Sequence, residues 1–152
     1  MSRKRRRRVG GLNRSEEMVM RRIYKRCARV EQGYRCFYCF CPLSLSATTA
    51  DHLIPLIDRG RTIYENIKAA CERCNGAKAT MHWQTFMDLI MQPVAHLTGA
   101  LAEIAWDRWM WQLVWSSSER IAAQVGIDAA PVLIAMQSEP ATTLHLGGQG
   151  DG

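Results

Sequence analysis

The sequence predicts an α+β protein whose first half is basic and whose second half is helical. Its 152 residues are 47% hydrophobic and 22% charged, which is enough apolar material for a buried core and excludes a disordered chain. Three observations predict the fold class. A basic helical segment comes first, a strand, loop, strand and helix follow within residues 34–81, and a Trp-rich helical region occupies residues 82–140.

The N-terminal residues 1–11 are predicted to form a disordered basic arm, because like charges repel and two glycines follow. The arm carries six consecutive cations, a number equal to the whole formal net charge of +6, and they are Arg3, Lys4, Arg5, Arg6, Arg7 and Arg8. Residues 1–80 hold 18 basic and 7 acidic side chains, whereas residues 81–152 hold 2 and 7. We therefore expect the arm to bind a polyanion such as DNA, although an import or partner-binding tag is an alternative.

Local signals place the elements of the first half. Ser15 and the apolar spacing after it predict a basic helix to Val30 that ends at Gly33. Extended segments are predicted over Tyr34–Pro42, Ala47–Leu56 and Asn66–Ala70, followed by a helix over Glu72–Met81. This order is strand, loop, strand, helix.

The Trp-rich region is predicted to form several helices. A first helix runs from Trp83 until Pro93 interrupts it, and a second has one apolar face, made of Leu101, Ile104, Ala105, Trp109 and Leu113. A capping signal at Ser116 predicts a third helix to Val125, and Asp128 is expected to cap a fourth to Met136. We expect this region to cover the first half or to pair two copies as a homodimer, and residues 141–152 to be a flexible tail.

Four cysteines have the spacing of a metal site. Cys36 and Cys39 form one C-x2-C pair and Cys71 and Cys74 form another, and two such pairs can fill the four positions around zinc. Four thiolate ligands close the site, so the zinc is expected to be structural and to support folding. Cys41 is a competing ligand, but the single residue between it and Cys39 would strain the chelate.

The residues between and after these pairs carry a resemblance. DHLIP at residues 51–55, then Gly60, Asn66 and CERCNGAK at 71–78, resemble the pattern of the HNH endonuclease family. The resemblance covers about residues 34–81 and implies the ββα-metal, or His-Me finger, fold with a zinc clamp. It departs from the family in having Asn75 at the third position of the motif and Phe40 where a glycine often follows the first cysteine pair.

The resemblance also implies roles for individual residues. His52 would be the general base that activates water, a role that suits an imidazole near neutral pH. Asp51 and Asn75 would hold a catalytic Mg²⁺ or Mn²⁺, because their oxygen atoms suit hard cations. Asn66 would brace the loop and orient His52. Successive side chains of a strand point to opposite faces, so Asp51 and His52 could serve one phosphate only from its two sides or from a bent strand.

Several further cations are expected to contact DNA. Lys78 would lie on the helix that faces the substrate, and Arg59, Arg61 and Arg73 would surround the same site.

The resulting hypothesis is a metal-dependent HNH endonuclease that hydrolyses DNA, similar to small enzymes of phage and bacterial genomes. The alternative is a zinc-stabilised nucleic-acid-binding module without catalysis. No secretory signal or membrane-spanning segment is evident in the sequence, so we expect a cytoplasmic protein of a bacterial or phage-infected cell.

Overall fold

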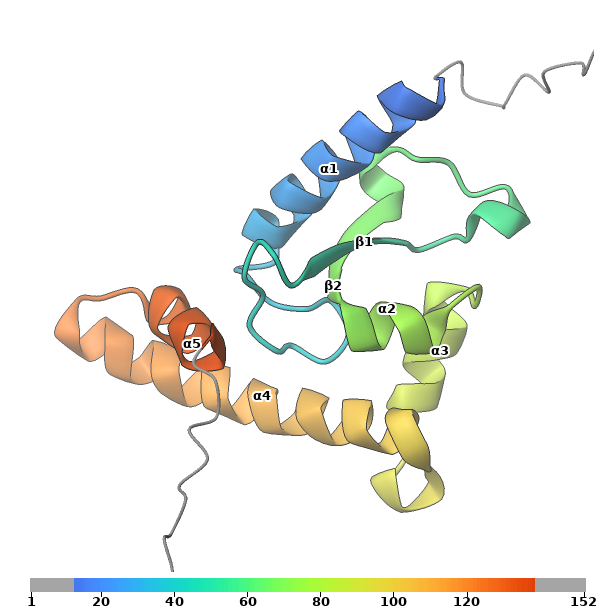
Figure 1. The fold of residues 1–152 in the computed structure, drawn as a ribbon. Helices are drawn as coiled ribbons and strands as arrows, with labels where there is room; N and C mark the ends of the chain where they lie inside the picture. The colour runs from blue at the N-terminus through green and yellow to red at the C-terminus, as the bar shows by residue number, and fades with distance from the viewer. Residues whose placement is uncertain (1–12, 139–152) are drawn as a thin grey trace, which may run out of the picture.

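The computed structural model describes residues 13–138 (Figure 1). Its regular elements are α1 (Arg14–Glu31), β1 (Thr48–His52), β2 (Ile67–Cys71), α2 (Glu72–Lys78), α3 (Trp83–Ile90), α4 (Gly99–Val125) and α5 (Ala129–Ser138), with single 3-10 turns at Leu56–Asp58, Tyr64–Asn66 and Val94–His96. The α+β class is confirmed. The predicted basic arm of residues 1–11, with Arg3 to Arg8, and the predicted tail of residues 141–152 lie outside the described residues.

Helix α1 begins at a capping box. The Asn13 side chain accepts hydrogen bonds from the backbone N–H groups of Ser15 and Glu16, each at 3.0 Å, and the Glu16 carboxylate accepts one from the Asn13 N–H at 2.8 Å. The helix ends at Glu31, and Gly33 follows with φ +61°, a conformation that favours glycine. The helix expected from Ser15 to Val30 is therefore confirmed to within one residue at each end.

The two strands form an antiparallel ribbon between helices. Asp51 pairs with Lys68 and His52 with Ile67. Figure 1 shows α1 on one side of the ribbon and α2 on the other. The Gln32 side chain, just after α1, donates to the Ala69 carbonyl at 2.8 Å and accepts from the Ala69 N–H at 3.0 Å, so the outer edge of β2 is occupied. This arrangement fixes α1 against the sheet.

Residues 34–42 form a tight knuckle instead of the predicted extended segment. A single β-bridge joins Arg35 to Pro42, and between them the Cys36 N–H donates to the Cys41 carbonyl at 2.9 Å. Phe40 has φ +61° in this turn. The prediction was wrong because the chain folds back sharply to bring its cysteines together, which a strand could not do.

Helix α4 is one continuous helix of 27 residues, so the predicted new helix at Ser116 was wrong. The Ser116 hydroxyl donates to the Gln112 carbonyl at 2.8 Å, one turn earlier, and serves the helix interior instead of a cap. The expected cap of the next helix is confirmed, since the Asp128 carboxylate accepts from the Ala130 N–H at 3.0 Å.

The buried face of α4 differs from the predicted one. Ile104, Ala105 and Trp115 are buried, but Trp109 and Leu113 are 55% and 51% exposed. Helix α4 is also held by hydrogen bonds to the knuckle, from Arg108 to the Tyr38 carbonyl and from Trp115 to the Phe40 carbonyl. Its orientation therefore does not depend on its apolar side chains alone. The homodimer expected through the Trp-rich helices remains a prediction. Among the described residues, no helix has both the length and the apolar character needed to cross a bilayer.

Candidate active site and metal centre

His52 lies at the end of β1 and is held by a polar chain that reaches α1. Its Nε2 is 3.1 Å from the Thr62 hydroxyl, and that hydroxyl donates to Glu17 Oε1 at 2.9 Å. Because the single hydroxyl proton of Thr62 points to Glu17, the Thr62 oxygen accepts from His52 Nε2–H. This pattern assigns the proton to Nε2 and leaves Nδ1 with a lone pair that can accept a proton.

The environment keeps this imidazole neutral. Burial, together with the positive charge of Arg21, lowers the pKa of His52 to about 4. The ring is therefore unprotonated at neutral pH, which is the state that a general base requires.

Asn66 braces the loop that follows His52. Its Nδ2 donates to the carbonyls of Ile54 at 3.0 Å and Arg61 at 2.9 Å, and its Oδ1 accepts from the Ile54 N–H at 2.8 Å. The loop also needs glycine at position 60, where an added Cβ would lie 1.8 Å from the Ile54 carbonyl oxygen. Asn66 thus fixes the loop that carries Thr62, the residue that contacts His52.

Asp51 occupies a buried polar cluster on the opposite face of β1. Its Oδ1 accepts from Lys78 Nζ at 3.0 Å, and its Oδ2 accepts from the Tyr38 hydroxyl at 2.5 Å. The Lys78 ammonium also donates to the His52 carbonyl at 2.8 Å. Burial raises the pKa of Asp51, while the hydrogen bond from Tyr38 and the charge of Lys78 act against that rise.

The position of Lys78 corrects the expectation that it contacts DNA. Its side chain is 1% exposed, because the ammonium is drawn to the buried Asp51 carboxylate, which balances its charge. Arg73 also differs from expectation, since it pairs with Asp107 and Glu103 of α4. Arg59 and Arg61 are exposed, and their contact with DNA remains a prediction.

The donor atoms on the α2 face are of the type that hard cations prefer. Asn75 is half-buried, and its Nδ2 donates to the Thr49 hydroxyl at 3.1 Å, on the same face of β1 as Asp51. Each carboxylate oxygen of Asp51 has a second lone pair, so the chemistry fits Mg²⁺ or Mn²⁺. Direct coordination would require the ion to share the carboxylate with Lys78 and Tyr38 or to displace one of them.

A cluster of thiols joins the knuckle to the end of β2. The sulfur atoms of Cys36, Cys39, Cys41 and Cys71 all lie within 4.8 Å of one another. The Cys39 and Cys71 sulfur atoms are 3.8 Å apart, close to the roughly 3.8 Å edge of a tetrahedron with 2.3 Å zinc–sulfur bonds. The donor set therefore fits zinc.

The cluster differs from the predicted quartet in one member. Cys41 lies within the group of four. Cys74 is completely buried and lies outside that group, and its backbone N–H donates to Cys71 Sγ at 3.4 Å. Hydrogen bonds from the neighbouring thiols, Cys36 first, lower the pKa of Cys71 well below its ordinary range. Cys41 and Cys74 are thus alternative candidates for the fourth ligand beside Cys36, Cys39 and Cys71.

Helix α4 covers this centre from the side of the knuckle. Arg108 donates to the Tyr38 carbonyl, and Trp115 Nε1 donates to the Phe40 carbonyl at 2.7 Å. The Arg108 guanidinium lies 4.2 Å from the centroid of the Phe40 ring. These contacts anchor the Trp-rich half to the cysteine knuckle.

Three residues of the site, Tyr38, Thr62 and Glu17, were not predicted from sequence patterns. Tyr38 lies between the first two cysteines of the motif, a position that could have drawn attention to it. Thr62 and Glu17 had no local signal, because their contact joins residues 45 positions apart.

The part of the chain that holds these residues is similar to known nucleases. Residues 36–80 match the HNH endonuclease family model. A stretch of 48 residues is 40% identical to the CRISPR-associated endonuclease Cas9 of Corynebacterium diphtheriae, and it covers 31% of this chain and 4% of that protein. The chain therefore spans only a small part of the length of this relative. Residues 36–80 form an HNH endonuclease domain, which is the class of nuclease that the resemblance implied.

Proposed function

We propose that the protein is a metal-dependent endonuclease that hydrolyses DNA phosphodiester bonds, with His52 as the general base. The observation that carries the proposal is the state of the His52 imidazole. The ring is neutral at pH 7, and its Nε2 proton is engaged by Thr62, so Nδ1 is available to deprotonate water. In this domain, the water would attack a phosphate at the end of β1.

Asp51 and Asn75 are proposed to hold the catalytic Mg²⁺ or Mn²⁺. The bound cation would neutralise negative charge that develops on the phosphoryl and leaving oxygens. Since Asp51 and His52 face opposite sides of β1, the phosphate would lie at the strand end between them. Lys78 and Tyr38 would orient the Asp51 carboxylate.

Zinc is proposed to be structural and bound by Cys36, Cys39 and Cys71, with Cys74 as the fourth ligand. Cys74 is preferred to Cys41, which lies in the observed thiol cluster, because the single residue between Cys39 and Cys41 would strain the chelate. The four proposed ligands join the knuckle to β2 and the first turn of α2. A closed thiolate site there would hold Asn75, one residue after Cys74, in place relative to β1.

The test is cleavage of supercoiled plasmid with and without added Mg²⁺ or Mn²⁺. His52→Ala should lower the rate about 10²–10⁴-fold, the usual contribution of a general base, without changing zinc content. His96→Ala is the matched control, because His96 is exposed and lies in a turn before α4. A His52→Ala rate within a factor of a few of the parent would remove His52 from this role.

A second candidate function is a zinc-stabilised nucleic-acid-binding module that does not cleave. One observation favours it: the Asp51 carboxylate is already hydrogen-bonded at both oxygens by Lys78 and Tyr38. Under this function, the plasmid would shift in a gel and remain uncut at every Mg²⁺ and Mn²⁺ concentration. Divalent-dependent nicking that Asn75→Ala abolishes would exclude it.

A further inference from the structure

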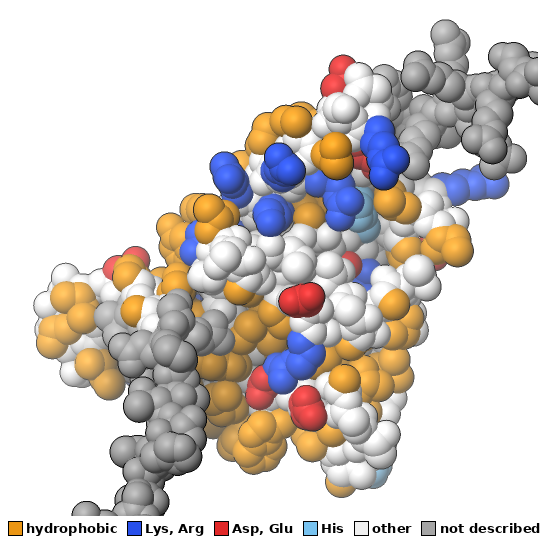
Figure 2. Space-filling view, in the orientation of Figure 1, with side chains coloured by type: hydrophobic (Ala, Val, Ile, Leu, Met, Phe, Trp, Pro, Cys, Tyr) orange, Lys and Arg blue, Asp and Glu red, His pale blue; other side chains and the backbone are white. Residues whose placement is uncertain are grey.

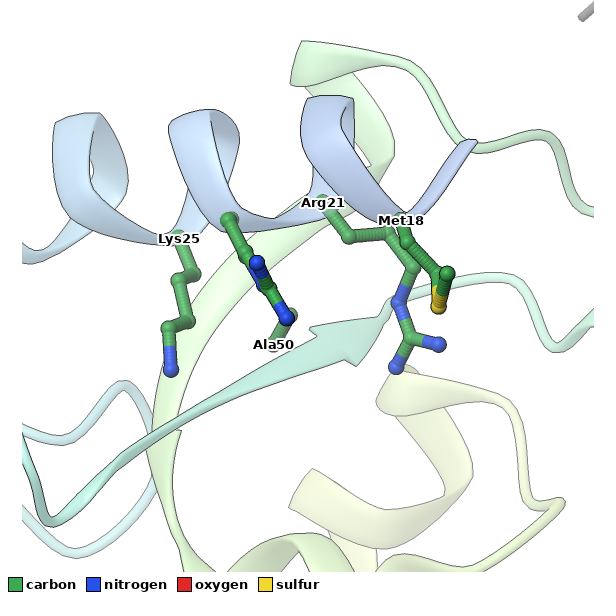
Figure 3. A pocket seen from close by; sticks show the side chains of 5 residues that line it. Met18, Arg21, Lys25 and Ala50 are labelled. Atoms are coloured by element: carbon green, nitrogen blue, oxygen red, sulfur yellow. The ribbon is translucent and has the colours of Figure 1, made fainter. Parts of the chain in front are cut away.

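An open hollow lies between α1 and β1 on the His52 face of the sheet. Its volume is about 190 Å³, and the residues that line it are Met18, Arg21, Arg22, Lys25 and Ala50. Figure 3 shows the side chains of Arg21 and Lys25 extending from α1 towards β1, where Ala50 forms the opposite wall. The small Ala50 side chain leaves this wall open.

The spacing of these residues makes the hollow a continuous basic surface. Positions 18, 21, 22 and 25 follow one side of a helix, so three cations line one wall. From Arg21 to Lys25 the helix rises about 6 Å, and one strand of DNA carries a charge for roughly every 3.4 Å of its axis. The row therefore matches about two successive phosphates.

The hollow is adjacent to the proposed base. Ala50 and His52 are two residues apart on β1, so their side chains share one face and lie roughly 7 Å apart along the strand. Arg21 is near enough to act on the His52 charge, and Glu17, one turn before it, holds Thr62 against His52. A strand of DNA in the hollow would therefore lead to His52.

The charges of the hollow are accessible to an anion from solution. Arg21 and Arg22 are exposed, unlike Lys78, whose ammonium is buried against Asp51. Lys25 donates to the Thr48 carbonyl at 2.8 Å, which fixes its ammonium over the β1 edge. Figure 2 shows Lys and Arg side chains gathered over α1, whereas in the lower part of the view basic atoms lie beside acidic ones.

We propose that Arg21, Arg22 and Lys25 bind two successive phosphates of the DNA strand that enters the active site, and so position the scissile phosphate at His52. This inference rests on the proposed function, since it takes DNA as the substrate. It adds α1 to the surfaces for which the sequence predicted DNA contact, which were the basic arm of Arg3 to Arg8 and the side chains of Arg59, Arg61, Arg73 and Lys78. The three side chains would bind the phosphate backbone and carry no base specificity.

The experiment measures the salt dependence of DNA binding in the full chain carrying His52→Ala, so that little DNA is cut during the measurement. Arg21→Gln with Arg22→Gln should flatten the slope of log affinity against log salt by about two, or roughly 0.9 for each phosphate that the variant no longer neutralises. The control is Arg26→Gln with Arg120→Gln, which removes the same charge from exposed positions outside the hollow. Its slope should equal that of the parent.

Cleavage by chains that retain His52 is the second measurement. The Arg21 and Arg22 double variant should need more DNA for half-maximal cutting, and the control pair should not. An unchanged slope, or equal flattening in both pairs, would overturn the proposal even if the parent cuts DNA. An uncut plasmid with the slope flattened only in the Arg21 and Arg22 variant would overturn the proposed catalysis and retain α1 as the DNA-binding surface.

Discussion

Lys78 and Asp51 form an ion pair inside the protein, with Nζ 3.0 Å from Oδ1 and side chains that are 1% and 3% exposed. The same ammonium donates to the His52 carbonyl at 2.8 Å. One lysine of α2 therefore contacts both residues of the DH motif, the carboxylate of the first and the backbone of the second. This side chain therefore fixes α2 relative to the end of β1.

Breaking this pair should destabilise the fold strongly. Lys78→Met leaves a buried carboxylate without a counter-charge, and we expect the free energy of unfolding to fall by about 3–5 kcal/mol. Adding Asp51→Asn should recover part of the loss, because the second change removes the uncompensated charge. Denaturant unfolding measures both variants.

Lys68→Met is the matched control for Lys78→Met. Lys68 lies on β2 and is half-buried, with its ammonium 5.9 Å from the Phe37 ring centroid. We expect a loss below about 1 kcal/mol for this control. A Lys78→Met loss of the same size would mean that the buried pair contributes little to stability.

Gly60→Ala should disrupt the loop beside His52. The added Cβ would stand 1.8 Å from the Ile54 carbonyl oxygen, a backbone atom that Asn66 also holds through its hydrogen bond. We expect a loss of about 1–3 kcal/mol or more in the free energy of unfolding. Gly76→Ala is the control, because its added Cβ meets nothing within 4 Å. Equal stability of the two variants would contradict the close approach.

Zinc measurements should identify the fourth thiolate. The purified protein is expected to hold about one zinc per chain. Cys74→Ser should release the metal and unfold the knuckle, whereas Cys41→Ser and the exposed Cys27→Ser should retain it. Retention by Cys74→Ser with loss in Cys41→Ser would instead assign the site to Cys36, Cys39, Cys41 and Cys71.

Stability should decrease as the pH falls below about 6.5. The folded pKa of His52 is about 4, below its ordinary value of 6.5, so the unfolded chain binds more protons between these values. The contribution of neutral His52 is thus complete above pH 6.5 and is lost as the pH approaches 4. His52→Gln should show a shallower decline in the free energy of unfolding between about pH 7 and 5.5, with zinc content checked at each pH. Parallel curves for parent and variant would contradict the lowered pKa.

Local sequence signals predicted the elements that are defined locally. The start of α1 to within one residue, the strand order, the start of α2 after Cys71 and the Asp128 cap all depend on neighbouring residues, although the cap of α1 is Asn13 and was not predicted. The predicted strand over residues 34–42 was wrong because the geometry of that segment is set by thiols far along the chain, as in the contact of Cys39 with Cys71, 32 positions later.

Long-range pairing also explains the site residues that differ from expectation. A lysine is normally exposed, and Lys78 is buried only because Asp51, 27 positions earlier, lies opposite it. Arg73 pairs with Asp107, which is 34 positions later. Neither partner could be deduced from charge or periodicity, although the motif correctly marked the segment in which Asp51 and Lys78 lie.

The cysteine knuckle depends on the C-terminal half of the chain through the contacts of Phe40 with α4. A non-glycine residue at φ +61° carries a backbone cost of roughly 1–2 kcal/mol. The ring and carbonyl of Phe40 are held by Arg108 and Trp115, which offset that cost. A segment that ends before α4 would keep the backbone cost at Phe40 without these contacts. We therefore expect a chain that ends before α4 to be less stable than the same segment within the whole chain, and Phe40→Gly to recover part of that loss.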